Sequence, residues 1–375
     1  MTALAELIQS DPATWLAVGG GVIGFLFGYV VNRTNFCTMG SISDFMSFGD
    51  WRRFRSWVLA AAVALAGTQF LALSGTIPLR ATMYLGTGFN WFGHVVGGLM
   101  FGYGMVYAGG CASKNLARLG GGDMRALVTL MVMGIFAYMT IGGILGPIRA
   151  GIEQATSVSL QAIGASSQGV GDLLGAVINT SAYTGSLMVT ALVSLAAFFY
   201  CFKDQSFRTS PSHVIAGLAI GVLVVLGWAL TGLGFDEMAD RPVAPISLTY
   251  VRPTADTIEW LQRYTAIPMP GFGVTTVLGA IFGSFVAAVS MRRFAFATFS
   301  TLFAGTASSP SETRRTLFGA ALMGIGGVMA LGCTVGQAIT GVSTLALGSF
   351  ITFAAIVAGG MVGMKRLENA LMNEA

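Results

Sequence analysis

Apolar positions in this chain come in long runs rather than in short alternating patterns. Each run is long enough to cross the roughly 30 Å hydrocarbon core of a bilayer. The nine runs lie at residues 13–31, 56–74, 84–108, 125–146, 186–202, 211–231, 274–290, 317–332 and 347–364. Four shorter segments between them are too polar to span alone, at 34–47, 111–119, 294–305 and 333–341. The pattern predicts an all-α integral membrane protein with about nine transmembrane helices plus short half-helices or re-entrant segments.

Two of the boundaries between an apolar run and a polar segment carry the same motif. Residues 96–116 read VGGLMFGYGMVYAGGCASKNL, and residues 318–338 read FGAALMGIGGVMALGCTVGQA. At a constant offset of 222, seven positions are identical, and they include Gly110–Cys111 and Gly332–Cys333. Each copy is a glycine-rich apolar helix that meets a Gly-Cys break and resumes as a polar segment. Broken helices in duplicated halves are typical of a transport site near the bilayer midplane.

A second, weaker repeat relates the first apolar run to a later one. Residues 18–28 match 277–287 at offset 259, and a one-residue slip then places Cys37 on Ala297. Together the two repeats predict two pseudo-symmetric halves.

We therefore expect one membrane transport domain covering residues 1–375. Its repeat halves lie at about 13–146 and 273–364, with scaffold helices at 186–231 between them. The 52 glycines fit this organisation, because small residues let helices pack closely in lipid. Gly20, Gly24 and Gly28 are spaced to form one such packing face.

Composition and charge agree with this class. The chain is 54% hydrophobic and 10% charged, with a mean hydropathy of +0.74, whereas a soluble domain carries about 25% charged residues. The net charge of +4 is concentrated in short loops, so it bears on topology and not on nucleic-acid binding. The basic loops can all face one side, which the positive-inside rule makes cytoplasmic. This predicts a multi-pass protein of the bacterial inner membrane with its N-terminus outside and its C-terminus inside.

The Gly-Cys breaks offer a specific chemistry. A helix that begins inside the membrane presents unpaired N–H groups and the positive end of its dipole, which together bind an anion without a basic side chain. Cys111 and Cys333 stand at such starts, directly after Gly110 and Gly332, where the missing side chain allows close approach. A neutral thiol is a weak donor and a soft, polarisable neighbour. These properties favour a small sulfur-containing anion as the ligand. Cys37, beside a polar run, is a third candidate.

Nearby polar residues are further candidates. Lys114 is placed to attract an anion from the cytoplasmic mouth, or else to snorkel at the interface. Asn115 and Gln337 occupy equivalent repeat positions and are placed to donate side-chain N–H groups. The alternative for each cysteine is burial as a small hydrophobe, which is our expectation for Cys201. His94 is interpreted as a packing residue that forms a hydrogen bond.

Other kinds of function lack a signal in this sequence. There is no Cys-x-x-Cys pair, no His/Asp/Glu cluster in the apolar runs and no cofactor fingerprint. We therefore expect no metal site, no cofactor and no enzymatic activity. A passive half-helix channel for another small anion, or for a sulfur or selenium compound, remains the alternative. A membrane enzyme handling thiols is the least supported.

The cysteine boxes resemble those of a known family. GGCAS at Cys111, GCTVG at Cys333 and FGYVVNRTNFC at Cys37 are similar to the YeeE/YedE family of sulfur-transport membrane proteins, whose characterised members take up thiosulfate. The resemblance covers the chain from about Gly19 to Met364. It implies an hourglass of about nine helices with half-helices.

The same resemblance implies a mechanism and partners. Thiosulfate would pass between cysteines through S–H contacts, with Cys111 and Cys333 as relay thiols and Cys37 as the third. Two positions depart from the pattern: Ala297 stands where a relay cysteine is expected, and Lys114 replaces a small residue. The resemblance also implies a separate small cytoplasmic sulfur carrier protein as a partner, beside the anion and the surrounding membrane lipid.

Overall fold

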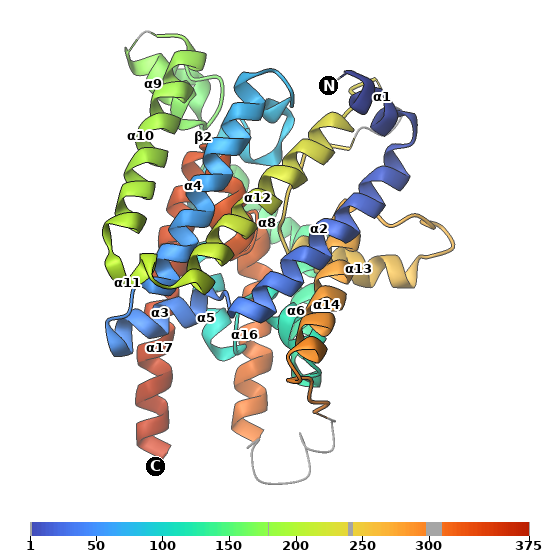
Figure 1. The fold of residues 1–375 in the computed structure, drawn as a ribbon, viewed down its shortest axis with the longest axis vertical. Helices are drawn as coiled ribbons and strands as arrows, with labels where there is room; N and C mark the ends of the chain where they lie inside the picture. Colours follow the sequence, from blue (N-terminus) through green and yellow to red (C-terminus); the bar gives the residue numbers. More distant parts are fainter. Residues whose placement is uncertain (1, 179, 239–242, 298–309, 375) are drawn as a thin grey trace.

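The computed structural model describes residues 2–178, 180–238, 243–297 and 310–374, and helices dominate it (Figure 1). Within these residues, eight helical stretches are long and apolar enough to cross a membrane, which confirms the all-α integral membrane class. The long helices are α2 (Pro12–Thr34), α4 (Arg52–Leu73), α7 (Met124–Ile141), α10 (Ala182–Lys203), α12 (Pro211–Leu233), α14 (Phe272–Ser290), α16 (Pro310–Met329) and α17 (Leu347–Glu374). Helix α5 (Gly98–Tyr107) is shorter and belongs to the longer helical stretch Gly93–Gly120. The two termini lie at opposite ends of the long axis (Figure 1).

Short elements connect the long helices. The short helices are α1 (Thr2–Ser10), α3 (Thr38–Phe48), α6 (Ala112–Gly120), α8 (Gly146–Thr156), α9 (Val170–Ile178), α11 (Gln205–Arg208) and α13 (Arg252–Gln262). Tighter or wider turns are η1 (Leu79–Ala81), η2 (Met83–Leu85), η3 (Gly93–Gly97), η4 (Leu160–Ile163) and η5 (Gly336–Gly341). Strands β1 (Gly88–Asn90) and β2 (Ser157–Ser159) pair antiparallel.

Two boundaries differ from those expected from hydropathy. The apolar run 84–108 becomes helical only from Trp91, because 84–90 is occupied by a turn and β1, and the Asn90 side chain accepts from the Gly93 N–H at 3.0 Å. The run 317–332 forms part of α16, whose first turns carry charged residues. Hydropathy measures only the length of an apolar run. It therefore did not predict that Asn90 caps the helix in this run and sets its first residue.

The polar segments 34–47, 111–119 and 333–341 largely form short helical pieces, as expected: α3, α6 and a helical stretch containing η5. Of the fourth, residues 294–297 run without helix into a β-bridge between Ala297 and Asp123. Residues 298–305 lie outside the described residues. Helix α2 is separated from α3 by Asn35, which has a left-handed φ of 54°.

Glycines set the packing of α2 against α14. A Cβ at Gly24 or Gly28 would collide with the carbonyl oxygens of Thr276 and Ala280 on α14, so the two backbones touch. Gly20 faces Phe272 of the same helix. This confirms the packing face predicted from the glycine spacing. Later residues of α2 contact later residues of α14, so the two helices run parallel.

Helices α5 and α16 pack in the opposite sense. A Cβ at Gly104 would lie 2.6 Å from the carbonyl oxygen of Gly319, and the reverse distance is also 2.6 Å. Gly97 and Gly326 meet in the same reciprocal way. Gly97 is equivalent to Gly319 in the repeat, and Gly104 to Gly326, so the two copies are antiparallel about a local two-fold axis. The parallel pair α2 and α14 does not follow this axis, and the weaker repeat therefore has a different basis.

The acidic stretch 232–272 between α12 and α14 has the charge that the positive-inside rule assigns to an outer loop, but it is not a surface loop throughout. Residues 246–251 run without helix into the protein, and Leu248, Tyr250 and Val251 are at most 1% exposed. The Thr340 hydroxyl donates to the Leu248 carbonyl at 2.6 Å and so satisfies a buried backbone group. The acidic residues of the stretch flank this uncharged segment, which is why overall charge suggested a loop.

Candidate functional site

The first Gly-Cys break is a tight, left-handed turn. Helix α5 ends at Tyr107, and Gly109 and Gly110 have φ of 70° and 146° before α6 begins at Ala112. The Gly110 N–H donates to the Met105 carbonyl at 2.8 Å. A Cβ at Gly110 would lie 2.9 Å from Cγ of Lys114. Both the backbone angle and the space therefore require glycine here.

The second break has the same construction. The Gly332 N–H donates to the Gly327 carbonyl at 2.8 Å, the same five-residue span as in the first copy. Leu331, equivalent to Gly109, also has a left-handed φ of 58°. Gly332 has no positive φ, and a Cβ there would meet only ordinary contacts from 3.5 Å. The repeat thus reproduces the shape of the turn with a different distribution of glycine.

Each break places its cysteine inside the protein. Cys111 and Cys333 are 0% exposed and Cys37 is 3% exposed. The sulfur of Cys333 accepts from the Gly336 N–H at 3.4 Å, and that of Cys37 accepts from the Gly40 N–H at the same distance. These two thiols therefore cap the helices that follow them. Cys111 does not cap α6, and its sulfur lies 3.3 Å from the Ser113 hydroxyl oxygen.

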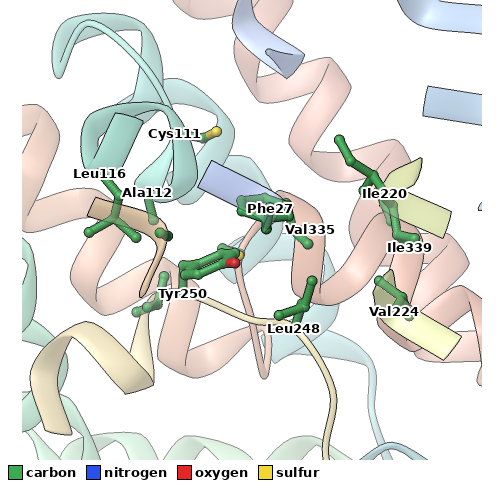
Figure 2. Close-up of a cluster of buried hydrophobic side chains, with 14 of the residues drawn as sticks. Phe27, Cys111, Ala112, Leu116, Ile220, Val224, Leu248, Tyr250, Val335 and Ile339 are labelled. Carbon is green, nitrogen blue, oxygen red and sulfur yellow. The ribbon is translucent and has the colours of Figure 1, made fainter. Parts of the chain in front are cut away.

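The three cysteines are neighbours in space. Cys37 lies within electrostatic range of Cys111, and Cys111 within range of Cys333. Figure 2 shows Cys111 in the buried cluster that also contains Phe27 and Tyr250. Cys201 belongs to a different cluster, with Leu59 and Phe207, and its thiol donates to the Arg55 carbonyl at 3.3 Å. The fold thus brings together the three cysteines singled out in the sequence and separates the fourth from them.

The side-chain amides of Asn115 and Gln337 donate hydrogen bonds to the backbone of the two Gly-Cys breaks. Nδ2 of Asn115 donates to the carbonyl oxygens of Gly110 at 2.8 Å and of Cys111 at 3.2 Å. Nε2 of Gln337 donates to the Ala330 carbonyl. Both amides are fully buried. In this structure their N–H groups are directed at the backbone of the breaks.

Two basic side chains lie near Cys37. Lys114 donates to the Asn35 side chain, and both Lys114 and Arg53 lie within electrostatic range of Cys37. A separate cavity of about 290 Å³ is lined by residues that include Gly109, Arg118 and Arg125. Arg118 donates to the Gly109 carbonyl at 3.0 Å, which ties this cavity to the first break.

Asp123 holds the basic residues at this cavity. Its carboxylate accepts from Nη2 of Arg118 at 2.7 Å and from Nε of Arg125 at 3.3 Å. Burial raises the pKa of Asp123, but the hydrogen bond and charge of Arg118 and the charge of Arg125 outweigh it and hold that pKa below its ordinary value. The carboxylate is therefore ionised at neutral pH.

Ala297 lies at the edge of the described structure. Its N–H donates to the Gly122 carbonyl at 3.1 Å, and it forms the bridge with Asp123. The side chain is half-buried. Its predicted relation to Cys37 stays a prediction. His94, left out of the predicted site, is buried and shares a hydrogen bond of 2.8 Å with Thr352 through Nδ1, as expected for a packing residue.

Three residues that sequence reasoning did not select also surround Cys333. The Thr249 hydroxyl lies 3.9 Å from its sulfur, and the backbone of Tyr250 hydrogen-bonds to it. Tyr84 lies within electrostatic range of the same thiol. The available signal was the uncharged stretch PISLTYV inside an otherwise acidic connection. Nothing local in the sequence placed that stretch against Cys333.

Comparison with known proteins places this architecture in a family. Residues 33–362 match the family described as sulphur transport. The chain is 28% identical to the thiosulfate transporter TsuA of Spirochaeta thermophila, with 91% of this chain and 96% of the relative covered. It is 26% identical to the thiosulfate transporter TsuA of Escherichia coli K12, with 86% and 87% covered. These names and the family description indicate a transporter rather than an enzyme.

Proposed function

The chain belongs to the sulphur transport family, and from that premise we propose that it takes up a small sulfur-containing anion, thiosulfate above all, along a path lined by Cys37, Cys111 and Cys333. The observation that carries the proposal is the construction of the two Gly-Cys breaks. Each stops an apolar helix inside the protein and delivers a buried thiol to the start of a new helical segment. The names of both relatives support thiosulfate as the substrate.

The path works by successive contacts with neutral groups. A thiolate would repel an anion, so the useful form of each cysteine is the thiol, which donates weakly through S–H and is polarisable toward the terminal sulfur of thiosulfate. The helix starts at Ala112 and Thr334 add N–H dipoles that favour negative charge. The anion contacts the three thiols one after another and so advances in short steps. Because the thiols are fully enclosed, small local openings must accompany each step.

Orientation follows from charge. The basic cavity beside Arg118 and Arg125 lies on the cytoplasmic side in this proposal, with the C-terminus there and the N-terminus outside, in a bacterial inner membrane. Thiosulfate then enters near Cys333, passes Cys111 and leaves past Cys37 and Lys114. A small cytoplasmic sulfur carrier protein would receive it at this basic end, and membrane lipid surrounds the exposed apolar faces.

Uptake of labelled thiosulfate by proteoliposomes containing the purified protein tests the proposal. Cys111→Ala and Cys333→Ala should each abolish uptake while the protein stays folded. Cys201→Ala is the matched control because Cys201 is equally buried but lies in a separate cluster. Competition with sulfite, sulfate and selenite ranks the substrates. Wild-type uptake by both site variants would return the thiols to a packing role, and near-normal flux through Cys111→Ser would favour the passive channel.

A further inference from the structure

Several buried polar atoms around Cys333 lack a hydrogen-bond partner. Within the described residues, the hydroxyls of Tyr84, Tyr250 and Thr334 and Oε1 of Gln337 are buried and unpaired. These four residues are at most 1% exposed. A buried hydroxyl without a partner costs roughly 1–3 kcal/mol, and natural proteins keep few of them. The three unpaired hydroxyls, those of Tyr84, Tyr250 and Thr334, therefore require an explanation.

The unpaired groups come from separate parts of the chain. Tyr84 belongs to η2, Tyr250 to the buried extended segment, and Thr334 follows Cys333 directly. Tyr84 and Tyr250 both lie within electrostatic range of the Cys333 thiol. Tertiary folding thus brings the two tyrosines near the thiol of Cys333, which Thr334 follows directly in the chain.

Aromatic contacts hold the two tyrosines in place. The Tyr250 ring packs on Phe27 with centroids 4.8 Å apart, and the Tyr84 ring meets Trp228 edge-on at 6.3 Å. The indole N–H of Trp228 is itself satisfied by the Ser343 hydroxyl at 3.0 Å. The hydroxyls are therefore held in fixed positions without being used by the protein. Fixed, unused donors are the groups that a bound acceptor would satisfy.

We infer that the hydroxyls of Tyr84, Tyr250 and Thr334 form the oxygen-binding half of a substrate site at Cys333, where they donate to the oxygen atoms of a sulfur oxyanion whose sulfur end faces the thiol. The inference rests on the proposed function and adds to it the residues that recognise oxygen. The donors are uncharged, so they replace the water lost by the anion without trapping it by a full opposite charge, as conduction requires.

A related arrangement at the other capping cysteine supports this assignment. Thr38 follows Cys37 as Thr334 follows Cys333, and its hydroxyl is likewise buried and without a partner in the described structure. In both places the N–H of a glycine three residues further along donates a hydrogen bond to the cysteine sulfur. A hydroxyl beside a capped thiol therefore recurs along the proposed path.

The experiment compares Tyr84→Phe, Tyr250→Phe and Thr334→Val with wild type in proteoliposome uptake and in thermal unfolding. Each variant should raise KM for thiosulfate roughly 10- to 100-fold, the value of one hydrogen bond to an anion. Without ligand, the melting temperature should stay level or rise, because an unpaired buried hydroxyl has been removed. Thiosulfate should then raise that temperature less than it does in wild type. Thr334→Ser, which keeps the hydroxyl, should retain wild-type KM.

Tyr264→Phe removes a hydroxyl from a 56% exposed tyrosine and is the matched control. Wild-type KM and a wild-type thiosulfate-induced shift in all three variants would overturn the inference alone. A fall in melting temperature without ligand, with KM unchanged, would also overturn it by showing a packing role. Absence of thiosulfate uptake by the wild-type protein would overturn the proposed function and the inference together.

Discussion

Asn115 closes the turn that precedes Cys111: its Nδ2 donates to the Gly110 carbonyl oxygen at 2.8 Å. This carbonyl group lies between two helices and has no backbone donor within either of them. A helix that stops inside a membrane leaves its last carbonyl groups without intrahelical donors. Water is scarce at that depth, so a side chain must replace it. Gln337 does the same for Ala330 at the second break. The residues beyond the cysteines therefore secure the shape of the two breaks.

Asn115→Ala should destabilise the fold. The carbonyl groups of Gly110 and Cys111 would lose this buried donor, at a cost of roughly 1–3 kcal/mol. Unfolding in detergent, followed by circular dichroism, measures the loss. Gln262→Ala, which removes an exposed amide at the end of α13, is the control and should change stability little. Equal stability of the two variants would show that the brace is dispensable.

Gly110→Ala should be more harmful than an alanine at an ordinary glycine. The φ of 146° disfavours any side chain, and the new Cβ would press on Lys114. We expect a loss of about 1–3 kcal/mol in the free energy of unfolding together with reduced uptake, because the turn positions Cys111. Gly271→Ala is the control, since its φ is −70° and nothing lies within 4 Å of the added Cβ. A Gly110→Ala protein as stable as the control would contradict the strained-turn assignment.

Asp123→Asn should lower stability in a pH-dependent way. The pKa of Asp123 is depressed in the folded protein, so its contribution is fully present above the ordinary aspartate pKa of about 4. It is lost as pH falls through the lower folded value. We expect wild type to exceed the variant by about 1 kcal/mol at pH 7 and the gap to close below pH 4. Thermal unfolding from pH 3 to pH 7 checks this, and a gap independent of pH would contradict it.

Ala297→Cys tests whether the weaker repeat has functional meaning. If Ala297 lies beside the path, the new thiol should be accepted without loss of folding and should retain or raise thiosulfate flux. In a background lacking the other cysteines, a thiol reagent should label it, and thiosulfate should block the labelling. Substrate-insensitive labelling, or none, would leave Ala297 as a residue that pairs with the Asp123 turn.

The site was only partly readable from the chain. The Gly-Cys repeat singled out Cys111 and Cys333 as candidates because two similar turns require similar residues at the same spacing. The use of Asn115 and Gln337 within the breaks was missed, since an amide that donates to a substrate and one that donates to a carbonyl look alike in a sequence. Tyr84 and Tyr250 were missed because no periodicity marks a residue that acts through a distant contact.

The sequence by itself determined where the chain enters lipid, where helices touch and where they break. These features depend on properties of neighbouring residues: apolar length, the spacing of Gly20, Gly24 and Gly28, and a glycine before a cysteine. Only the tertiary structure decided that α5 and α16 are antiparallel while α2 and α14 are parallel. The tertiary structure also places the buried segment that contains Tyr250 next to Cys333. Such contacts join residues far apart in sequence, and packing of the whole bundle selects them, so no local pattern records the choice.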